Sequence, residues 1–347
     1  MTTNPTVPDA GVDDRRAISA LVFGHMAAQT LAAAVRLGVP DRLDDTGRPA
    51  GDVAGDLGTD PAATLRLLRA LAALGLAGEP EPGIFAATAR GALLRRDRPD
   101  SLAAFVEMFL DPAMVAAWAK LDDSVRTGRT TFDEVFGVDF FGHLAAHPHL
   151  SRTFNASMRQ ATAAVSAVLP GAVDLRRFDS LMDVGGGDGT LLASILAGHP
   201  HLRGVLFDSA AGAAESAIAL ADFPYRVEVV TGDFFVGVPG GCEAYLMKSI
   251  VHDWDDAAVT TILRHLHAVV PDHGRLFVVE PVLPGTADGS AHPITYLSDL
   301  NMMVNVGGRE RTEEEFRALL AAGGFELVSA EPLPAPAVFT VLEAAPT

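Results

Sequence analysis

The sequence predicts a two-domain α/β protein in which a mainly helical N-terminal part precedes a parallel sheet covered by helices on both faces. Its length of 347 residues is greater than that of an ordinary single domain and suits two domains. From about Phe178, short apolar runs alternate with helical segments, which is typical of a parallel sheet between helical layers. We therefore divide the chain into a helical N-terminal domain over 1–100, a helical connector over 101–170 and a sheet domain over 171–347.

The sequence pattern of the N-terminal part predicts a winged helix. A helix over 15–38 has apolar residues at helical spacing and ends at Gly38. Residues 48–95 then follow the order helix, turn, helix and hairpin. The helix that would read DNA offers only Arg66 and Arg69 among alanines and leucines. This composition favours packing or dimerisation over DNA binding.

The composition excludes several classes of partner and compartment. A formal net charge of -18 opposes binding to nucleic acid, because phosphate contacts need clustered Lys and Arg. The single cysteine, Cys242, cannot form an internal disulfide, and it fits a reducing compartment. The first sixteen residues are polar, include Asp9, and lack the basic start of a signal peptide. We therefore expect a cytoplasmic protein without a nucleic-acid partner.

One apolar stretch, over residues 17–35, raises the alternative of a membrane-spanning helix. His25, Gln29 and Thr30 interrupt this stretch, and Arg36 closes it. We interpret it as an amphipathic helix that needs a partner surface, and we expect no membrane association.

A glycine-rich turn follows the first strand of the predicted sheet. The strand SLMDV runs into GGGDG at 185–189, and a helical segment comes next. Glycines there let the backbone approach a ligand at the N-terminus of a helix. A dinucleotide fingerprint needs a glycine where this chain has Thr190, which disfavours a nicotinamide dehydrogenase. The spacing DxGxGxG matches the first motif of class I methyltransferases, and a plain strand-to-helix turn is the structural alternative.

Two further acids stand at the ends of the next two strands. Asp208 closes GVLFD, where a carboxylate can accept both hydroxyls of a ribose. Asp233 closes VEVVTGD, within reach of an adenine amine. Each acid alone could be a solvated turn residue, but three such features in succession converge on one crevice.

The segment KSIVHDWDD, at 248–256, carries a family resemblance. Together with GDFF at 232–235 and GGRERTEEEF at 307–316, it closely resembles the plant caffeate-type and bacterial antibiotic-pathway O-methyltransferases. The likeness spans nearly the whole chain. It implies a Rossmann-like class I methyltransferase domain, an N-terminal winged-helix dimerisation domain, a homodimer, and S-adenosylmethionine as the cofactor, with S-adenosylhomocysteine as its product. The Ala- and Arg-rich composition favours a natural-product pathway.

The resemblance also implies which residues form the site. His252 is the general base, and Glu280 and Glu310 are the acids that flank it. The cofactor contacts are Asp183, Gly185 and Gly187 at the methionine end, Asp208 at the ribose, Gly232, Asp233 and Phe234 at the adenine, and Lys248 and Ser249 beside them. The substrate contacts are Phe154, Asn155, Met158, Asp253, Met302 and Asn305. Met302 and Asn305 are, in the alternative, core or loop residues.

These residue types suit methyl transfer to a hydroxyl. A phenol of pKa about 10 is mostly protonated near neutrality, whereas imidazole at about 6.5 is mostly free base. His252 can then accept the hydroxyl proton while the oxygen attacks the methyl carbon in line, and a carboxylate at the other ring nitrogen would fix the tautomer. In the alternative, His252 is a capping residue before DWDD, and both glutamates are solvated. No metal is expected, because the HxxE and HExxH spacings are missing from the sequence.

Other functions remain open beside O-methylation of a small hydroxylated aromatic molecule. A family member could keep the cofactor yet hydroxylate or decarboxylate its ligand, although loss of the base would favour that and His252 is present. A ligand-sensing winged-helix regulator is opposed by the acidic charge. The acceptor, the pathway and the principal partner of His252 among the two glutamates stay open.

Overall fold

The computed structural model of the chain describes residues 11–287, 289, 291–335 and 337–347. The chain divides into two compact units, residues 1–110 and 111–347. The predicted connector is split between them, because α5 (Ala103–Phe109) lies in the first unit and the helices after it lie in the second. The expected lack of a signal peptide concerns a segment that begins at residues 1–10, which lie outside the described residues.

The first unit has the predicted order of helix, turn, helix and hairpin. Its strands form a small antiparallel sheet in the order β1-β3-β2. The core between this sheet and the helices includes Val53, Leu68 and Phe85, all with no exposed surface. The elements are α1 (Val12–Leu37), η1 (Pro40–Arg42), β1 (Arg48–Pro49), α2 (Ala50–Leu57), α3 (Pro61–Ala73), β2 (Ala77–Glu81), β3 (Ile84–Ala87), α4 (Ala89–Ala92) and α5.

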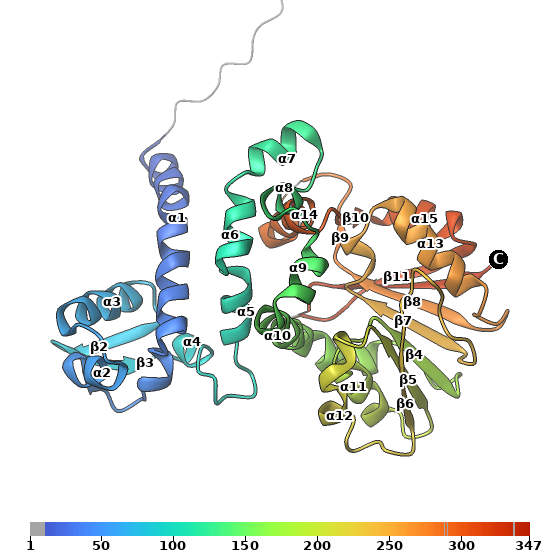
Figure 1. The fold of residues 1–347 in the computed structure, drawn as a ribbon, viewed down its shortest axis with the longest axis horizontal. Coiled ribbons are helices and arrows are strands. Elements are labelled where there is room, and N and C mark those ends of the chain that lie inside the picture. Colours follow the sequence, from blue (N-terminus) through green and yellow to red (C-terminus); the bar gives the residue numbers. More distant parts are fainter. Residues whose placement is uncertain (1–10, 288, 290, 336) are drawn as a thin grey trace, which may run out of the picture. The chain divides into compact units, whose positions relative to one another are not determined.

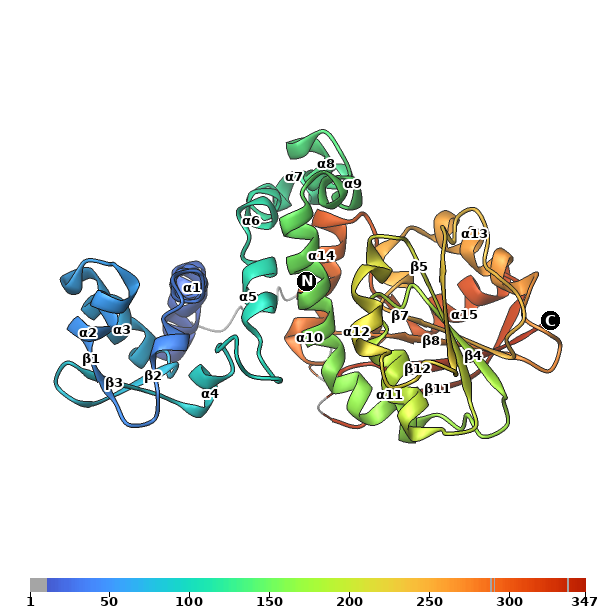
Figure 2. The ribbon, with the colours of Figure 1, turned by 60° about the horizontal axis from the view of Figure 1, so that its bottom comes forward.

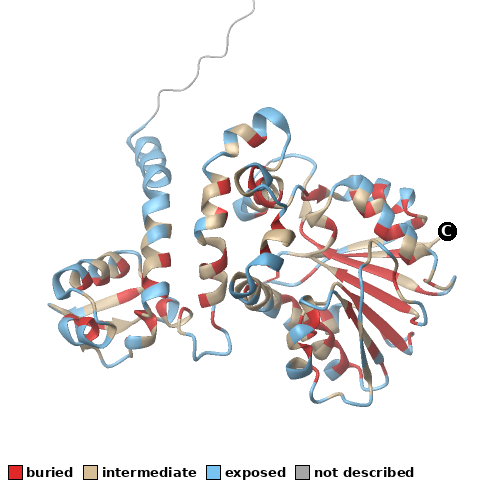
Figure 3. Ribbon diagram, viewed as in Figure 1, coloured by how far each residue is buried: buried red, intermediate tan, exposed pale blue. Residues whose placement is uncertain are grey.

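Helix α1 leaves much apolar surface uncovered. Leu21, Phe23 and Met26 are each more than half exposed, and most of the helix is coloured as exposed in Figure 3. By length and composition alone α1 could cross a membrane, and 17% of its most apolar window is buried. One such helix near an N-terminus is weak evidence for a span, because a helix that docks on a partner passes the same test.

The second unit begins with a group of helices beside the sheet. Helices α6, α7 and α8 pack around α14, as Figure 2 also shows. The bounds are α6 (Pro112–Trp118), α7 (Leu121–Thr127), α8 (Thr131–Phe136), α9 (Phe140–Ala146), α10 (Pro148–Ala172) and α14 (Pro293–Asn305).

The large sheet has seven strands in the order β11-β12-β8-β7-β4-β5-β6 (Figure 1). Its strands are β4 (Ser180–Val184), β5 (Arg203–Asp208), β6 (Val227–Thr231), β7 (Ala244–Lys248), β8 (Arg275–Glu280), β11 (Phe325–Pro332) and β12 (Thr340–Pro346). The helical segments between them are α11 (Thr190–Gly198), η2 (Gly212–Glu215), α12 (Ser216–Ala219), η3 (Val251–Asp253), α13 (Asp256–His267) and α15 (Glu313–Ala322), and a short pair β9 (Val282–Leu283) and β10 (Arg311–Thr312) lies apart.

The sheet is parallel, as predicted, except at one strand. Strands β4 to β8 pair in parallel, but β12 pairs antiparallel with both β8 and β11. The connection over residues 333–339 is too short for a parallel crossover, which needs roughly a dozen residues or more. The sheet is therefore mixed.

The alternation of side chains along the central strands decides on which face of the sheet each site residue lies. In β7, Tyr245 and Met247 join the hydrophobic core under α13 and α15, whereas Leu246 joins the core under α10 and α11. Because side chains alternate between faces, Lys248 falls on the α10 face. The same count along β8, in which Val278 faces the α13 core, puts Glu280 on the opposite face from Lys248.

Candidate active site

The glycine-rich turn joins β4 to α11 at the carboxyl edge of the parallel strands. Gly185, Gly187 and Gly189 all have positive φ, at 73°, 59° and 78°. A side chain at Gly185 would collide with Ile250, whereas Gly187 has open space where a side chain would be. The N–H of Gly187 donates to Oδ2 of Asp208 at 2.7 Å. The backbone at Gly187 is therefore open to a ligand.

Asp183 is buried at the end of β4 with one carboxylate oxygen unpaired. Its side chain lies against Gly186, and its Oδ2 has no hydrogen-bond partner among the described residues. Burial and the negative charge of Asp208 raise the pKa of Asp183 to about 7, although the nearby Lys248 ammonium opposes that rise. Such a carboxylate is costly to keep charged unless a cation approaches it.

The two other strand-end acids lie on the same edge. Asp208 accepts hydrogen bonds from the backbone N–H groups of Gly187 and Ser209, and burial raises its pKa. The N–H of Gly232 donates to the carbonyl oxygen of Asp208 at 2.9 Å, which ties the end of β6 to the end of β5. Asp233 itself is exposed and accepts from the N–H of Phe235.

Lys248 and Ser249 form the end of β7. Lys248 Nζ donates to Oγ1 of Thr162 at 3.0 Å and lies 5.0 Å above the ring of Phe339. Burial lowers the pKa of Lys248 to about 8, against the pull of Glu280, Asp183 and Asp253. Ser249 is the one described non-glycine residue with positive φ, at 55°, a conformation typical of functional sites.

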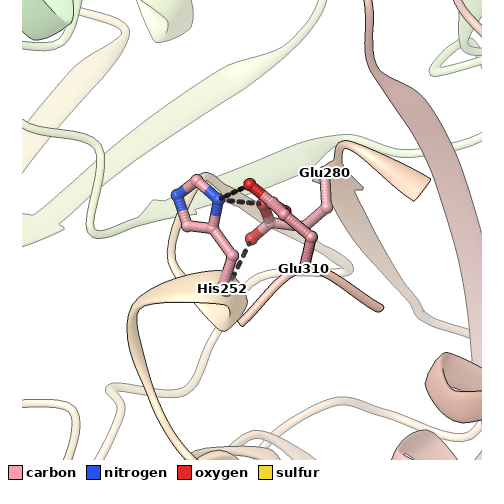
Figure 4. A group of neighbouring side chains, drawn as sticks. All are labelled: His252, Glu280 and Glu310. Atoms are coloured by element: carbon pink, nitrogen blue, oxygen red, sulfur yellow. Dashed lines mark hydrogen bonds and ion pairs between the residues drawn. The ribbon is translucent and has the colours of Figure 1, made fainter. Parts of the chain in front are cut away.

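His252 lies in η3, directly after β7, and its Nδ1 faces two buried glutamates. Nδ1 is 3.1 Å from Oε1 of Glu310 and 3.5 Å from Oε2 of Glu280 (Figure 4). The other ring nitrogen points away from both carboxylates, and the nearest acid to it is Asp253 at 3.6 Å. The His252 side chain is 13% exposed.

The carboxylates change the charge expected for His252. Burial disfavours the imidazolium, but Glu280, the hydrogen bond to Glu310, and Asp253 outweigh burial and raise the pKa of His252 to about 10. Burial likewise raises the pKa of Glu280 to about 7 and of Asp253 to about 6. These acids stabilise the imidazolium and so oppose the free-base imidazole expected from the sequence, which does not reveal how many acids converge on the ring.

The two glutamates have different tasks. Oε1 of Glu280 accepts the backbone N–H groups of Ile250 and Val251 at 2.9 and 2.8 Å, so Glu280 shapes the loop that carries His252. Glu310 orients the imidazole instead, and Ser298 Oγ holds the same Glu310 oxygen at 2.8 Å. Neither glutamate is solvated, since they are 0% and 3% exposed.

Arg311 secures this loop and was not identified from the sequence. Its side chain is fully buried and donates to the carbonyl oxygens of Val251 and Trp254 at 2.9 and 2.8 Å and to Asp256. The N–H of Arg309 also donates to the carbonyl oxygen of His252. An arginine in a charged run reads as a surface residue, and only its position next to Glu310 could have singled it out.

Aromatic side chains from four segments gather at the His252 loop. Trp254 stacks on Phe141 with ring centroids 5.4 Å apart and meets Phe234 edge-on at 6.2 Å. Phe154 in turn packs edge-on against Phe140 and Phe141. Phe154 and Phe234 were expected from the sequence, whereas Trp254 and Phe141 were not.

The remaining predicted substrate residues lie on α10 and α14. Asn155 donates to the carbonyl oxygen of Ala211 at 3.3 Å, and the carbonyl oxygen of Met158 accepts from Thr162, the partner of Lys248. Met302 and Asn305 are buried, at 9% and 1% exposure. All of the predicted site residues belong to the second unit.

Three side chains with metal-ligating atoms converge in the site although no metal-binding spacing occurs in the sequence. One ligand atom each from His252, Glu280 and Glu310 lies within 4.8 Å of the others, a grouping that could hold a cation. These residues come from three separate segments, so no local spacing announces the group. The absence of a metal stays an expectation.

The mixed sheet, the glycine turn and the strand-end acids together define a class I methyltransferase domain. The chain belongs to the O-methyltransferase family with a dimerisation domain: residues 118–326 match the O-methyltransferase domain, and residues 19–97 match the O-methyltransferase dimerisation domain. The predicted family is confirmed. The protein is an S-adenosylmethionine-dependent O-methyltransferase, and the regulator and dehydrogenase hypotheses fall.

Three relatives illustrate the likeness. O-demethylpuromycin-O-methyltransferase of Streptomyces alboniger is 48% identical over 95% of this chain and 88% of the relative. The 3-amino-4-hydroxybenzoate 4-O-methyltransferase of Streptomyces cremeus is 38% identical over 92% of this chain and 87% of the relative. The structure of CalO1, a methyltransferase in calicheamicin biosynthesis with bound S-adenosylhomocysteine, superposes with a TM-score of 0.84 at 30% identity, covering 98% of this chain and all of that one.

Proposed function

We propose that the protein methylates a hydroxyl group of a small aromatic natural-product intermediate and that His252 removes the hydroxyl proton. The observation that carries this proposal is the imidazole itself, held through Nδ1 by Glu310 with its other nitrogen turned away from both glutamates. The names of the relatives support the substrate class, since one acts on an aminohydroxybenzoate and another serves calicheamicin biosynthesis.

The residues at the glycine turn fit the cofactor. The open backbone at Gly187 can approach a ligand closely, and the unpaired Asp183 carboxylate offers negative charge to a cation. Asp208 and Asp233 offer acceptors for ribose and adenine groups, and Phe234 offers an apolar ring face. S-adenosylmethionine, when bound, supplies a methyl group that its sulfonium has already activated.

His252 and its carboxylates act as one proton-accepting group. Because the acids stabilise the imidazolium, the cluster must lose a proton before the free ring nitrogen can take one from a substrate. Once deprotonated, an imidazole of pKa about 10 is matched to a phenol, so transfer of the proton between them costs little. Glu310 then balances the imidazolium that forms.

The aromatic cluster favours a flat acceptor. Phe141, Phe154 and Trp254 present ring faces and edges beside the His252 loop, and such rings pack well against another aromatic ring. A flat ring held there fixes its hydroxyl relative to the base, and such placement is a large part of catalysis.

Methyl transfer from labelled S-adenosylmethionine to a panel of phenols tests the function. We expect label in the ether product of at least one phenol, and far slower labelling when His252 is replaced. Consumption of a ligand without label in it would favour the hydroxylating or decarboxylating alternative. Label on an amine in place of a hydroxyl would contradict the proposed acceptor.

Glu310→Gln should move the pH profile of turnover toward acid. In the wild type the carboxylates raise the pKa of His252, so turnover rises with pH above neutrality. Removing one carboxylate lowers that pKa, and the rising limb shifts down by about 1 to 3 pH units, the usual effect of one close opposite charge. The maximal rate also falls, because the imidazolium loses its partner.

The matched control is Glu315→Gln, since Glu315 lies in the same segment but contacts Arg309 and Thr312 rather than His252. Its pH profile should equal that of the wild type. An unchanged limb in Glu310→Gln would remove Glu310 from the proton-accepting group.

We further propose that the protein is a homodimer that covers the apolar side of α1. The exposed Leu21, Phe23 and Met26 give the match to a dimerisation domain a physical basis. Light scattering on the full chain should give twice the monomer mass, and Phe23→Asp should lower that mass. A monomeric wild type at micromolar concentration would contradict the proposal.

A further inference from the structure

Two buried carboxylate oxygens beside His252 have no hydrogen-bond donor among the described residues. They are Oε2 of Glu280 and Oε2 of Glu310. The first lies 3.5 Å from Nδ1 of His252, and the second belongs to the carboxylate whose Oε1 lies 3.1 Å from the same nitrogen (Figure 4). Burying an anionic oxygen without a donor is costly, so a further positive charge would stabilise this cluster.

The charges around the ring favour a divalent cation. Glu280 and Glu310 carry two negative charges when both are ionised, and Asp253 lies 3.6 Å from the other ring nitrogen. An imidazolium supplies one positive charge, which balances only half of the glutamate pair. Lys248 attracts Glu280 but donates to Thr162 rather than to a glutamate. A divalent cation between the glutamates balances both of them.

The spacing of the possible ligand atoms suits zinc. Nδ1 of His252 and one oxygen from each glutamate all lie within 4.8 Å of one another. Bonds of about 2.0–2.2 Å to a tetrahedral zinc ion put neighbouring ligand atoms about 3.4 Å apart, close to the 3.5 Å between Nδ1 and Oε2 of Glu280. The imidazole nitrogen favours zinc over magnesium, because magnesium prefers oxygen ligands and keeps several waters.

Neighbouring groups already orient the two glutamates. Two backbone N–H groups of the His252 loop hold Oε1 of Glu280, and the other oxygen of Glu280 faces the ring. Ser298 Oγ donates to Oε1 of Glu310 at 2.8 Å. Outer partners of this kind orient the ligands of metal ions in proteins. Small side-chain shifts are therefore enough for the cluster to surround a cation.

We propose that His252, Glu280 and Glu310 form an inhibitory site for Zn²⁺. The cation replaces the proton on Nδ1, which passes to water. The imidazole then keeps its remaining proton on the other ring nitrogen, which has no lone pair left for the hydroxyl proton of a substrate. Binding of the cation is independent of the proposed function, whereas the inhibition rests on it, because this cation disables a general base.

Calorimetry on the full-length protein, treated with a chelator and then desalted, tests binding. We expect one Zn²⁺ per chain to bind at the cluster, and Mg²⁺ at the same concentration not to bind. His252→Ala and Glu310→Gln each alter a ligand, so each should weaken Zn²⁺ binding at least as much as loss of an outer partner does, about 10- to 100-fold. Two variants keep the test valid if one does not fold. Unchanged affinity in either folded variant, or no binding to the wild type, overturns the inference.

His143→Ala is the matched control. His143 and His147 stack at the end of α9 with ring centroids 4.0 Å apart, so they offer Zn²⁺ a different pair of nitrogens. The control should bind Zn²⁺ as tightly as the wild type does. Loss of binding in His143→Ala together with full binding in His252→Ala would place the ion at the stacked pair and overturn the inference.

Methyl transfer from labelled S-adenosylmethionine tests the inhibition. Saturating Zn²⁺ should lower turnover of the wild type to the level of His252→Ala, and excess chelator should restore it. The affinity for S-adenosylhomocysteine should not change, and the residual turnover of His252→Ala should not respond to Zn²⁺.

The two measurements separate this inference from the proposed function. Zn²⁺ that binds at the cluster while turnover stays at the wild-type rate overturns the inference and leaves the proposed function intact. Zn²⁺ binding in a protein that methylates no phenol, even with chelator present, counts against the proposed function, and calorimetry then supports the cation site by itself.

Discussion

His252→Ala should lower turnover by about 10²- to 10⁴-fold, the usual contribution of a general base, while affinity for S-adenosylmethionine changes little. The loss falls on turnover because His252 faces Glu310 and Glu280 rather than the glycine turn. Turnover measured with labelled cofactor, beside calorimetric affinity for S-adenosylhomocysteine, separates the two effects.

His201→Ala is the matched control, because His201 is exposed in the connection after α11. Its turnover and its affinity for the cofactor should both equal those of the wild type. Parallel losses of turnover and cofactor affinity in His252→Ala would instead make His252 a structural residue of the loop.

Asp183→Asn should have two large effects of opposite sign. Without cofactor the variant should melt several degrees higher than the wild type, since about 1 kcal/mol corresponds to roughly 2–4 °C in a domain of this size. The substitution removes a buried, unpaired negative charge without changing the shape of the side chain. Lys248 loses one of three nearby carboxylates but keeps Glu280 and Asp253.

The same substitution should weaken binding of S-adenosylmethionine tenfold or more, because the cation of the cofactor loses a buried counter-charge. The pH dependence follows from the raised pKa. The folded protein binds the proton of Asp183 more tightly than the unfolded chain does. The free energy of unfolding therefore falls as pH rises from the unfolded pKa near 4 through the folded pKa of about 7. The melting difference between variant and wild type should therefore widen from pH 5 to pH 8.

Differential scanning calorimetry across that pH range checks the result. Asp179→Asn, an exposed acid just before β4, should show no pH-dependent difference. A destabilised Asp183→Asn at pH 8 would mean that the carboxylate has a partner that holds it in its charged form.

Local sequence patterns predicted the strands and turns that carry the site, but not the charges of its buried side chains. The strand SLMDV, the glycines after it and the acids at 208 and 233 are short-range signals, so β4 to β6 and their shared edge could be predicted. The antiparallel β12 was missed because apolar alternation carries no direction. Only the short connection over 333–339 excludes a parallel crossover.

The His252 cluster marks where sequence reasoning stops. Glu280 and Glu310 were named from resemblance, yet their unequal tasks depend on which oxygen meets which N–H, and these contacts join residues about 30 and 60 positions apart. Arg311 shows the same limit. A fully buried arginine that donates to Val251 and Trp254 is indistinguishable, in sequence, from the solvated arginines around it.

The chain has two tryptophans, and both lie where ligands are expected. Trp254 stacks on Phe141 beside the His252 loop, and Trp118 donates to Asn301. Intrinsic fluorescence of the unlabelled protein therefore originates almost entirely from the ligand-binding region. Stopped-flow emission could follow entry of cofactor and acceptor in real time, and Trp118→Phe would assign each phase to one of the two chromophores.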